Sequence, residues 1–313
     1  MITKNSKWAF EAEVGRFQFI EKSMYGISRL INVSKILYSG ETKYQRIDLF
    51  ESLLFGKVLV LDGLVQFSSY DEYIYHEALV HPTMLSIENP RKVLIIGGGD
   101  GGALRQVLKH SIVEKVILVD IDREVIEFSK KYFPTLGKSF DDPRVKVIID
   151  DGRKFIKETT EIFDFIIIDL TDPSGPSRYL YTKEFYQLVK SKLADDGAIV
   201  THAESLYVYQ YFFISILRTL SAVFKVTRPY KAYVPSFGFL WGYVTASEIV
   251  DPLTISEKEI EKRMHERGVT TKFYYPELHK SLFILPKDVL EAIEKSDAPI
   301  STDEKPIELP LIY

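Results

Sequence analysis

The stretch KVLIIGGGDGGALRQVL, at 92–108, constrains the fold of this chain more than any other feature. Its apolar run breaks into GGGDGG at 97–102 and then resumes in a helical pattern. This order predicts a strand, a tight turn and a helix, because glycine allows positive φ and lets the backbone approach a ligand closely. Dehydrogenases, flavoproteins and methyltransferases share such a turn, so by itself it does not choose a function.

The sequence after the glycine turn alternates between apolar runs and helical patterns. The runs at 116–119, 145–149 and 165–168 are continuously apolar, which predicts a parallel sheet buried on both faces. Ligands of such sheets bind at the carboxyl ends of the strands. Four carboxylates are expected at that edge: Asp100, Asp120, Asp151 and Asp169.

The sequence before the glycine turn has a different pattern. Residues 25–69 alternate between apolar and polar positions, and Asp62-Gly63 is a strong hairpin signal between two such runs. A helical spacing follows at 71–84 and is expected to end near Pro82. We therefore predict an α/β protein. A small N-terminal antiparallel β domain, at 1–70, precedes a Rossmann-like doubly wound domain at 71–313, which includes a linking helix at 71–90 and a less readable segment at 250–313.

Composition narrows the class of protein. The 313 residues are 46% hydrophobic, enough for a proper core, and the net charge of −4 indicates neither a nucleic-acid nor a membrane partner. Cysteine is absent, which excludes disulfides and thiol chemistry. The N-terminus has no apolar signal region and no segment is apolar for long enough to span a membrane, so we expect a cytoplasmic protein.

Asp100 is the unusual residue of the glycine turn. A carboxylate there repels an incoming phosphate or carboxylate and favours an ammonium group, although it could merely cap the following helix. A dinucleotide would place its pyrophosphate beside Asp100, which disfavours a nicotinamide cofactor. An adenosyl sulfonium ligand has no phosphate, and its decarboxylated form ends in an ammonium group that Asp100 can pair with.

Asp120 and Asp151 are candidates for binding the adenosine part. Asp120 ends the second strand about twenty residues after the glycine turn, where an acidic residue binds ribose hydroxyls, unless its place is a coincidence. Ile121 would lie beside the adenine or, equally well, in the core. Asp151, before Gly152, could accept a hydrogen bond from the adenine amino group or only cap a helix.

The sequence DLTDPSGP, at 169–176, is the second strong feature. Its two carboxylates, Asp169 and Asp172, are three residues apart and could face one pocket from a structured lid. A solvated turn is the alternative. Together with Asp100 they would form a site rich in carboxylates, which suits a polycation.

The histidines show no metal-binding spacing, and we predict neither a metal nor a resident cofactor. They are His76, His81, His110, His202, His265 and His279. On sequence alone, His76 would be a structural or surface residue.

Four motifs together resemble the spermidine synthase family, the polyamine aminopropyltransferases. They are GGGDGG at 97–102, VLDGLVQ at 60–66, DEYIYHE at 71–77 and DLTDPSGP at 169–176, in the order of the family. The likeness extends over residues 25–244. It implies an enzyme of polyamine and spermidine biosynthesis with a methyltransferase-type catalytic domain, assembled as a homodimer or homotetramer.

The resemblance also assigns roles to individual residues. Donor or methylthioadenosine contacts would come from Gln45, Gly97, Asp100, Asp120, Ile121, Asp151, Gly152 and Pro176. Asp100 and Asp169 would bracket the aminopropyl ammonium, and Asp169 would be the proton acceptor. The amine acceptor would contact Tyr75, His76, Asp100, Asp169, Asp172, Glu204 and Phe237, with Glu204 near its far amino group.

One position departs from the family pattern. The family usually has a tyrosine in the run after Pro235, and this chain has Phe237 there. The lost hydroxyl leaves the identity of the amine acceptor open, unless Phe237 is a core aromatic that faces away from the channel.

We therefore expect transfer of a 3-aminopropyl group from decarboxylated S-adenosylmethionine, a co-substrate, to a primary amine such as putrescine or agmatine, with release of 5'-methylthioadenosine. A methyltransferase that uses S-adenosylmethionine on the same fold, or a non-catalytic small-molecule-binding protein, are the alternatives.

Overall fold

The computed structural model describes residues 8–11, 16–22 and 26–309. These residues form two compact units. The first contains the described residues up to Glu72 together with 234–238, and the second contains 73–233 and 239–309. The division lies two residues beyond the predicted boundary at 70. The short segment 234–238 groups with the first unit, although the sequence placed it in the second.

The first unit consists of two antiparallel sheets. A three-stranded sheet has the order β1-β2-β3 and a four-stranded sheet the order β4-β5-β6-β7. The hairpin between the last two strands turns at Asp62 and Gly63, with φ of 46° and 77°, so the predicted turn is confirmed. The strands are β1 (Trp8–Glu11), β2 (Arg16–Lys22), β3 (Ser28–Val33), β4 (Lys35–Glu41), β5 (Arg46–Ser52), β6 (Gly56–Leu61) and β7 (Leu64–Ser68).

Buried carboxylates explain why 234–238 groups with the first unit. Glu21 accepts a hydrogen bond from the Val65 amide (2.7 Å) and pairs with Arg29. The Arg29 guanidinium donates in turn to the Ser236 carbonyl (2.7 Å), and the Ser236 amide donates to Asp71 (2.6 Å). Charge-assisted hydrogen bonds to the backbone therefore hold this turn within the unit.

The second unit has one seven-stranded sheet of the order β10-β9-β8-β11-β12-β14-β13. The strands from β10 to β12 are parallel, and β14 runs antiparallel to β12. The parallel core confirms the doubly wound prediction. The strands are β8 (Lys92–Gly97), β9 (Lys115–Asp120), β10 (Val145–Ile149), β11 (Phe163–Asp169), β12 (Leu193–Ser205), β13 (Val226–Val234) and β14 (Phe239–Ser247).

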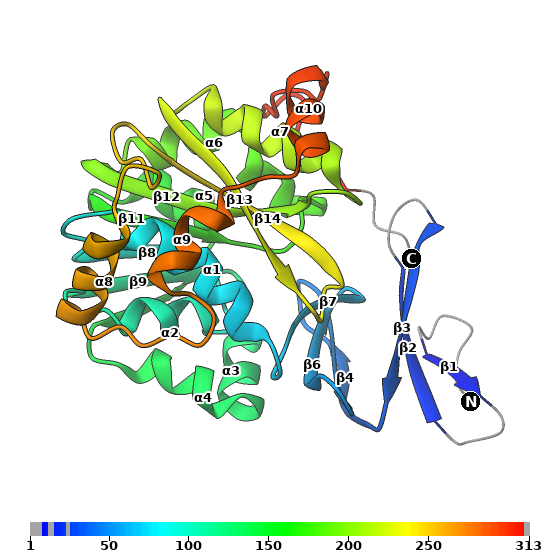
Figure 1. Cartoon of the computed structure of the whole chain (residues 1–313). Helices are drawn as coiled ribbons and strands as arrows, with labels where there is room; N and C mark the ends of the chain where they lie inside the picture. Colours follow the sequence, from blue (N-terminus) through cyan, green and yellow to red (C-terminus); the bar gives the residue numbers. More distant parts are fainter. Residues whose placement is uncertain (1–7, 12–15, 23–25, 310–313) are drawn as a thin grey trace. The chain divides into compact units, whose positions relative to one another are not determined.

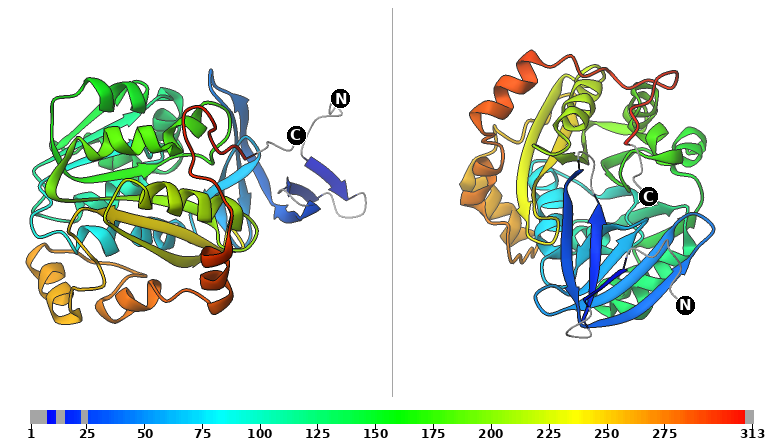
Figure 2. Two further views of the ribbon diagram at one scale, coloured as in Figure 1. Left: turned by 90° about the horizontal axis from the view of Figure 1, so that it is seen from above. Right: turned by 90° about the vertical axis from the view of Figure 1, so that its right-hand side faces the viewer.

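Helices cover both faces of this sheet (Figures 1 and 2). The segment at 250–309, which the sequence left unread, adds three more helices. None of the described helices is both long and apolar enough to cross a membrane. The helices are α1 (Glu72–Met84), α2 (Gly102–Leu108), α3 (Arg123–Tyr132), α4 (Pro134–Gly137), η2 (Lys138–Asp141), α5 (Gly152–Glu158), η3 (Gly175–Tyr181), α6 (Lys183–Lys190), α7 (Gln210–Ser221), α8 (Glu257–Glu266), α9 (Pro276–Leu282) and α10 (Lys287–Lys295).

The helix α1 passes through Pro82 instead of ending there. Proline has no amide hydrogen, so Pro82 cannot donate to the carbonyl of Ala78 one turn earlier. The Tyr230 hydroxyl donates to that carbonyl instead, at 3.0 Å, and replaces the lost hydrogen bond. The helix therefore continues two residues past Pro82 and ends at Met84, the last residue of the predicted helical spacing at 71–84.

Two buried charges join α1 to the C-terminal part of the unit. The Glu77 carboxylate accepts hydrogen bonds from the amides of residues 272–274 at 2.8–3.1 Å, and Lys109 lies 3.5 Å away. Arg267, 4% exposed, donates to the carbonyl groups of Met84, Ile87 and Glu88. The charged side chains therefore satisfy the backbone at the end of α1 and in the loop before α9.

We expect Glu77→Gln to destabilise the protein by about 2–3 kcal/mol, because the neutral amide leaves one backbone donor facing an NH₂ group and loses the ion pair with Lys109. Urea unfolding measures the difference. Glu277→Gln, at an exposed position of α9, is the control and should change stability by less than about 0.5 kcal/mol. Equal effects of the two substitutions would contradict the anchoring role.

Candidate active site

The glycine turn lets the neighbouring strand β11 and helix α1 approach its backbone closely. Gly97 and Gly101 have φ of 81° and 84°, which L side chains rarely adopt. A Cβ at Gly97 would lie 2.1 Å from the Asp169 carbonyl oxygen, and one at Gly102 would lie 2.0 Å from the His76 ring. The glycines are therefore needed because strand β11 and helix α1 press against the turn.

Asp100 lies in the glycine turn, directly before Gly101, the N-cap residue of α2. Its Oδ1 accepts a hydrogen bond from the Gly102 amide (2.5 Å), the first residue of α2, so the capping alternative describes part of its role. His76 Nε2 lies 3.4 Å from the same oxygen. Burial alone would raise the pKa of Asp100, but His76 and the Gly102 amide outweigh burial and lower it. Asp100 is therefore the anionic member of the site.

Asp169 ends strand β11 and is 8% exposed. Its Oδ1 accepts a hydrogen bond from the Tyr75 hydroxyl (2.8 Å), whereas its buried Oδ2 has no partner among the described residues. Burial, followed by the negative charge of Asp100, raises the pKa of Asp169 to about 7. The site therefore holds a carboxyl group that can take up or release a proton near neutral pH.

His76, Asp100 and Asp169 form one compact cluster. Each offers a ligand atom, and these atoms lie within 4.8 Å of one another. His76 is 1% exposed, so the surface role considered for it is wrong. The cluster can hold a single cation, either an ammonium group or a metal ion. The sequence contains no metal-binding spacing because α1, the glycine turn and β11 each contribute one residue.

Asp120 is held by two backbone amides. Its Oδ2 accepts from Gly99 (3.0 Å) and its Oδ1 from Asp122 (2.8 Å). Burial raises its pKa to about 6. The neighbouring Ile121 is 40% exposed, so the core alternative for this side chain is wrong. An exposed apolar side chain beside a fixed carboxylate fits a nucleoside better than a structural role.

Asp151 and Gly152 begin helix α5. The Asp151 carboxylate accepts a hydrogen bond from the Lys154 amide (2.8 Å), so it is the helix N-cap. A Cβ at Gly152 would lie 2.4 Å from a methyl group of Ile96, which explains the glycine by packing against β8. Both residues stand at the carboxyl end of the parallel strands, where the sequence placed them.

The 170–181 loop contains Asp172, and two buried side chains contact the carbonyl groups of its first residues. The Tyr181 hydroxyl lies 3.0 Å from the Thr171 carbonyl oxygen, and His202 Nε2 lies 2.8 Å from that of Leu170. A carbonyl only accepts, so Nε2 of His202 carries the hydrogen. Burial lowers the pKa of His202 to about 4, which keeps the ring neutral. The loop is thus a structured segment and not a solvated turn.

Hydrogen bonds within the loop also order it. Ser174 and Ser177 exchange side-chain and backbone hydrogen bonds, and the Asp172 carbonyl accepts from both the Ser174 amide (2.7 Å) and the Ser177 hydroxyl (2.6 Å). Pro176, the predicted donor contact, is exposed in the first turn of η3. The loop therefore presents Asp172 and Pro176 from a fixed backbone.

Glu204 is fully buried at the end of β12 and has φ of 70°. Its carboxyl group lies beside that of Asp172, and the two interact by charge and by a side-chain hydrogen bond. Burial, and after it the charge of Asp172, raises its pKa. The structure thus places a buried acid with a left-handed backbone beside a second acid, and its role in binding the acceptor remains a prediction.

Gln45 and Phe237 belong to the first unit. Gln45 ends the turn that joins β4 to β5, where its backbone bonds to Thr42. Phe237 is 7% exposed in the 234–238 turn. Their contributions to the site remain predictions.

Sequence reasoning missed three residues around the cluster. Tyr181 and His202 were not singled out because they act through loop carbonyl groups, which carry no sequence signal. Trp241 stacks on His202, with ring centroids 6.0 Å apart and planes at 20°. The ring of Tyr75 lies 6.4 Å from that of His202. An aromatic wall thus lies beside the acidic cluster.

The fold and this site together define a Rossmann-like domain of the methyltransferase type with an acidic cluster at its glycine turn. Residues 72–254 match the spermine/spermidine synthase domain family, and residues 18–69 match the spermidine synthase tetramerisation domain. The chain belongs to the spermidine synthase family. It is therefore an enzyme, an aminopropyltransferase, with a domain of a kind that assembles subunits.

Relatives and solved structures agree. The polyamine aminopropyltransferase of Sulfurisphaera tokodaii is 48% identical over 282 residues, covering 89% of this chain and 93% of the relative. That of Korarchaeum cryptofilum is 45% identical over 298 residues, covering 94% and 92%. The spermidine synthase of Thermotoga maritima superposes with a TM-score of 0.83 at 36% identity, covering 89% and 94%. A spermidine synthase bound to the transition-state analogue AdoDATO gives 0.84 at 36%, covering 89% and 95%.

The raised pKa of Asp169 predicts how stability depends on pH. The unfolded chain releases this proton near pH 3.8, whereas the folded protein keeps it until about pH 7, so this group makes stability fall as pH rises between them. Asp169→Asn should remove this loss, which amounts to at most about 1.4 kcal/mol per pH unit. Urea unfolding from pH 4.5 to 7 measures it.

The control for this experiment is Asp150→Asn. Asp150 is partly exposed and pairs with Lys154, which lowers its pKa, so its replacement should not remove the loss. A slope that is the same in Asp169→Asn and in the parent protein would contradict the assignment of a raised pKa to Asp169.

Proposed function

We propose that this chain transfers a 3-aminopropyl group from decarboxylated S-adenosylmethionine to a primary amine and releases 5'-methylthioadenosine. The observation that carries the proposal is the buried acidic cluster at the glycine turn. Asp100 and Asp169 lie together there, and one oxygen of Asp169 has no partner among the described residues. A buried carboxylate without a partner is unfavourable, so the site is built to receive a cation.

The charge of the cluster favours the decarboxylated donor. S-adenosylmethionine itself carries a carboxylate on its amino acid tail, which Asp100 would repel, whereas the decarboxylated form ends in an ammonium group. Asp120, with Ile121 beside it, would hold the ribose and adenine, and Asp151 with Gly152 would lie near the adenine amino group. Gln45, Gly97 and Pro176 would complete the donor site. A methyltransferase would need a cationic or neutral group where Asp100 stands.

The reaction needs a base that removes a proton from the acceptor amine. The amine nitrogen attacks the aminopropyl carbon, the bond from that carbon to the sulfonium sulfur breaks, and the electron pair leaves with methylthioadenosine. An alkylammonium has a pKa near about 10.4, so the acceptor must first lose a proton. Asp169 would take it on the oxygen that Tyr75 does not occupy, since one ring hydroxyl already fixes the other oxygen.

The acceptor would extend from Asp169 toward the second pair of acids. Tyr75 and His76 would line the first part of its channel, and Asp172 with Glu204 would bind the far amino group. A diamine is the smallest ligand that satisfies both pairs of acids. The charge of that far group would lower the cost of ionising Glu204, whose pKa is raised in the protein alone.

Asp169→Asn should lower turnover by roughly 10²–10⁴-fold, because the amide cannot accept the proton. Binding of methylthioadenosine, which has no amine to deprotonate, should stay within about threefold of the parent value, by calorimetry. Turnover is followed by the mass of the product, in which an aminopropyl group adds three carbons and a methyl group one. Near-normal turnover in Asp169→Asn would refute the general base. A one-carbon addition would identify a methyltransferase.

The acceptor range should be broad. A site discriminates against a mismatched ligand largely through its own buried polar groups that stay unpaired, and Phe237 lacks the hydroxyl group that the family usually has. We expect activity with putrescine and with agmatine, and a narrower range in Phe237→Tyr. The measurement is kcat/KM for putrescine, diaminopropane, cadaverine and agmatine in both proteins. A preference of the parent enzyme above about a hundredfold would contradict this prediction.

Assembly and location complete the proposal. The match to a tetramerisation domain supports a homodimer or homotetramer, formed through the first unit. Small substrates and the net charge of −4 support a cytoplasmic enzyme without a nucleic-acid or membrane partner. We expect no metal or resident cofactor, because the sulfonium group itself activates the carbon that is attacked.

A further inference from the structure

The last described residues, 296–309, form an extended segment that we call the C-terminal strap. It is fixed to α7 at its start, where the Ser215 hydroxyl donates to the Pro299 carbonyl (2.6 Å) and the Ser301 amide donates to Thr219 (2.9 Å). Four of its side chains are buried: Ala298, Ser301, Ile307 and Leu309. The strap is therefore a packed part of the second unit.

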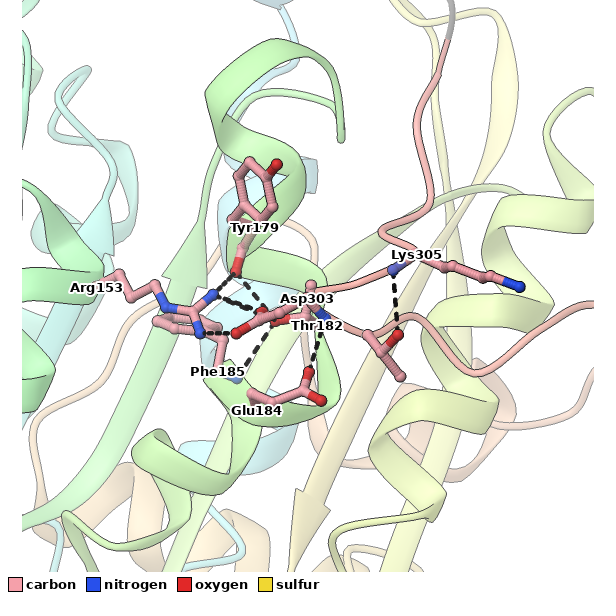
Figure 3. A network of polar contacts seen from close by, with 8 residues as sticks. Arg153, Tyr179, Thr182, Glu184, Phe185, Asp303 and Lys305 are labelled. Atoms are coloured by element: carbon pink, nitrogen blue, oxygen red, sulfur yellow. Dashed lines mark hydrogen bonds and ion pairs between the residues drawn. The ribbon is translucent and has the colours of Figure 1, made fainter.

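A polar junction joins the middle of the strap to α5, α6 and the 170–181 loop (Figure 3). The Asp303 carboxylate accepts two hydrogen bonds from Arg153, at 2.8 and 2.5 Å, and one from the Thr182 hydroxyl (2.7 Å). The Asp303 amide donates to Glu184 (2.9 Å). Arg153 also donates to the Tyr179 carbonyl (2.9 Å), so one guanidinium binds both the strap and the end of the loop.

The end of the strap contacts the loop directly. The Leu309 amide donates to the Pro173 carbonyl (2.8 Å), next to Asp172. Glu308 pairs with Arg178 in η3 at 2.5 Å. The strap and Arg153 thus bind the loop near both of its ends. These contacts add to the hydrogen bonds that Tyr181 and His202 make with the first residues of the loop.

We propose that the C-terminal strap positions the 170–181 loop for substrate binding, with Asp303 and Arg153 as the positioning pair. A loop that is ordered before the ligand arrives loses little conformational entropy on binding, whereas a released loop must be ordered by the substrates. Neither residue touches the acidic cluster, so both act through the loop. The ordering stands on these contacts alone, and its kinetic consequence rests on the proposed function.

The test uses the full chain with Asp303→Ala, Arg153→Gln and the double variant. Hydrogen exchange followed by mass spectrometry reports on peptides that cover 170–182, without any substrate. We expect exchange in these peptides to become at least about tenfold faster in each variant, with exchange in the strands of the sheet unchanged. The double variant should match the singles, because the two residues form one link.

Kinetics supply the second measurement. With both substrates saturating, kcat should stay within about twofold of the parent value, because bound ligands reorder the loop, while KM for the amine should rise about five- to tenfold. The matched control is Asp251→Ala, which breaks the Arg228–Asp251 pair, another two-hydrogen-bond contact of this unit at 2.5 and 3.0 Å. It should leave both loop exchange and KM at the parent values.

Three results would overturn the proposal. They are loop exchange in Asp303→Ala equal to that of the parent, faster exchange throughout the sheet, and equal changes in KM from Asp303→Ala and Asp251→Ala. Faster loop exchange in a chain that shows no aminopropyl transfer would refute the proposed function and leave the ordering of the loop intact.

Discussion

The electrostatics of the site follow from the burial of two neighbouring carboxyl groups, those of Asp100 and Asp169. Asp100 and Asp169 lie together. Burial, and after it the charge of Asp100, opposes the ionisation of Asp169, whereas His76 and the Gly102 amide lower the pKa of Asp100. Burying the two carboxyl groups next to each other lowers the free energy of unfolding of the protein. A cationic substrate relieves the repulsion that the fold imposes, so the same electrostatics that weaken the empty protein strengthen its complex. The two substrates proposed above would fit this constraint, because each carries an ammonium group.

Much of the fold could be predicted from the sequence, because short-range patterns determine it. The glycine turn, the parallel strands that end in aspartate and the Asp62-Gly63 hairpin depend on neighbours in the chain. The contact by which Tyr230 replaces the hydrogen bond that Pro82 cannot make in α1 could not be predicted, because the two residues lie far apart in the sequence. The secondary structure of the segment after residue 250 was hard to predict for a similar reason. Buried charges such as Glu77 and Arg267, which lie far away in the sequence, hold parts of it in place.

The site likewise contains residues that the sequence indicated and residues that it did not. Asp100, Asp120 and Asp169 could be found from their places at strand ends, and the structure brings Asp100 and Asp169 together with His76. The sequence indicated that Asp151 could cap a helix or bind the adenine amino group. It could not distinguish these two roles, because a carboxylate at this position could perform either. Tyr181 and His202 could not be found, since they bind carbonyl groups that every residue has. Glu204 was suggested by resemblance alone, and its left-handed backbone is a property that no local pattern shows.

The link between Arg153 and Asp303 also bears on how the protein is made. The two residues are 150 positions apart in the sequence. The ribosome synthesises the strands of the sheet, the acidic cluster and the 170–181 loop long before the strap leaves the exit tunnel. A nascent chain can thus form its sheet while the loop still lacks its outer support. The loop gains this outer support only after residue 303 has been synthesised and has left the exit tunnel.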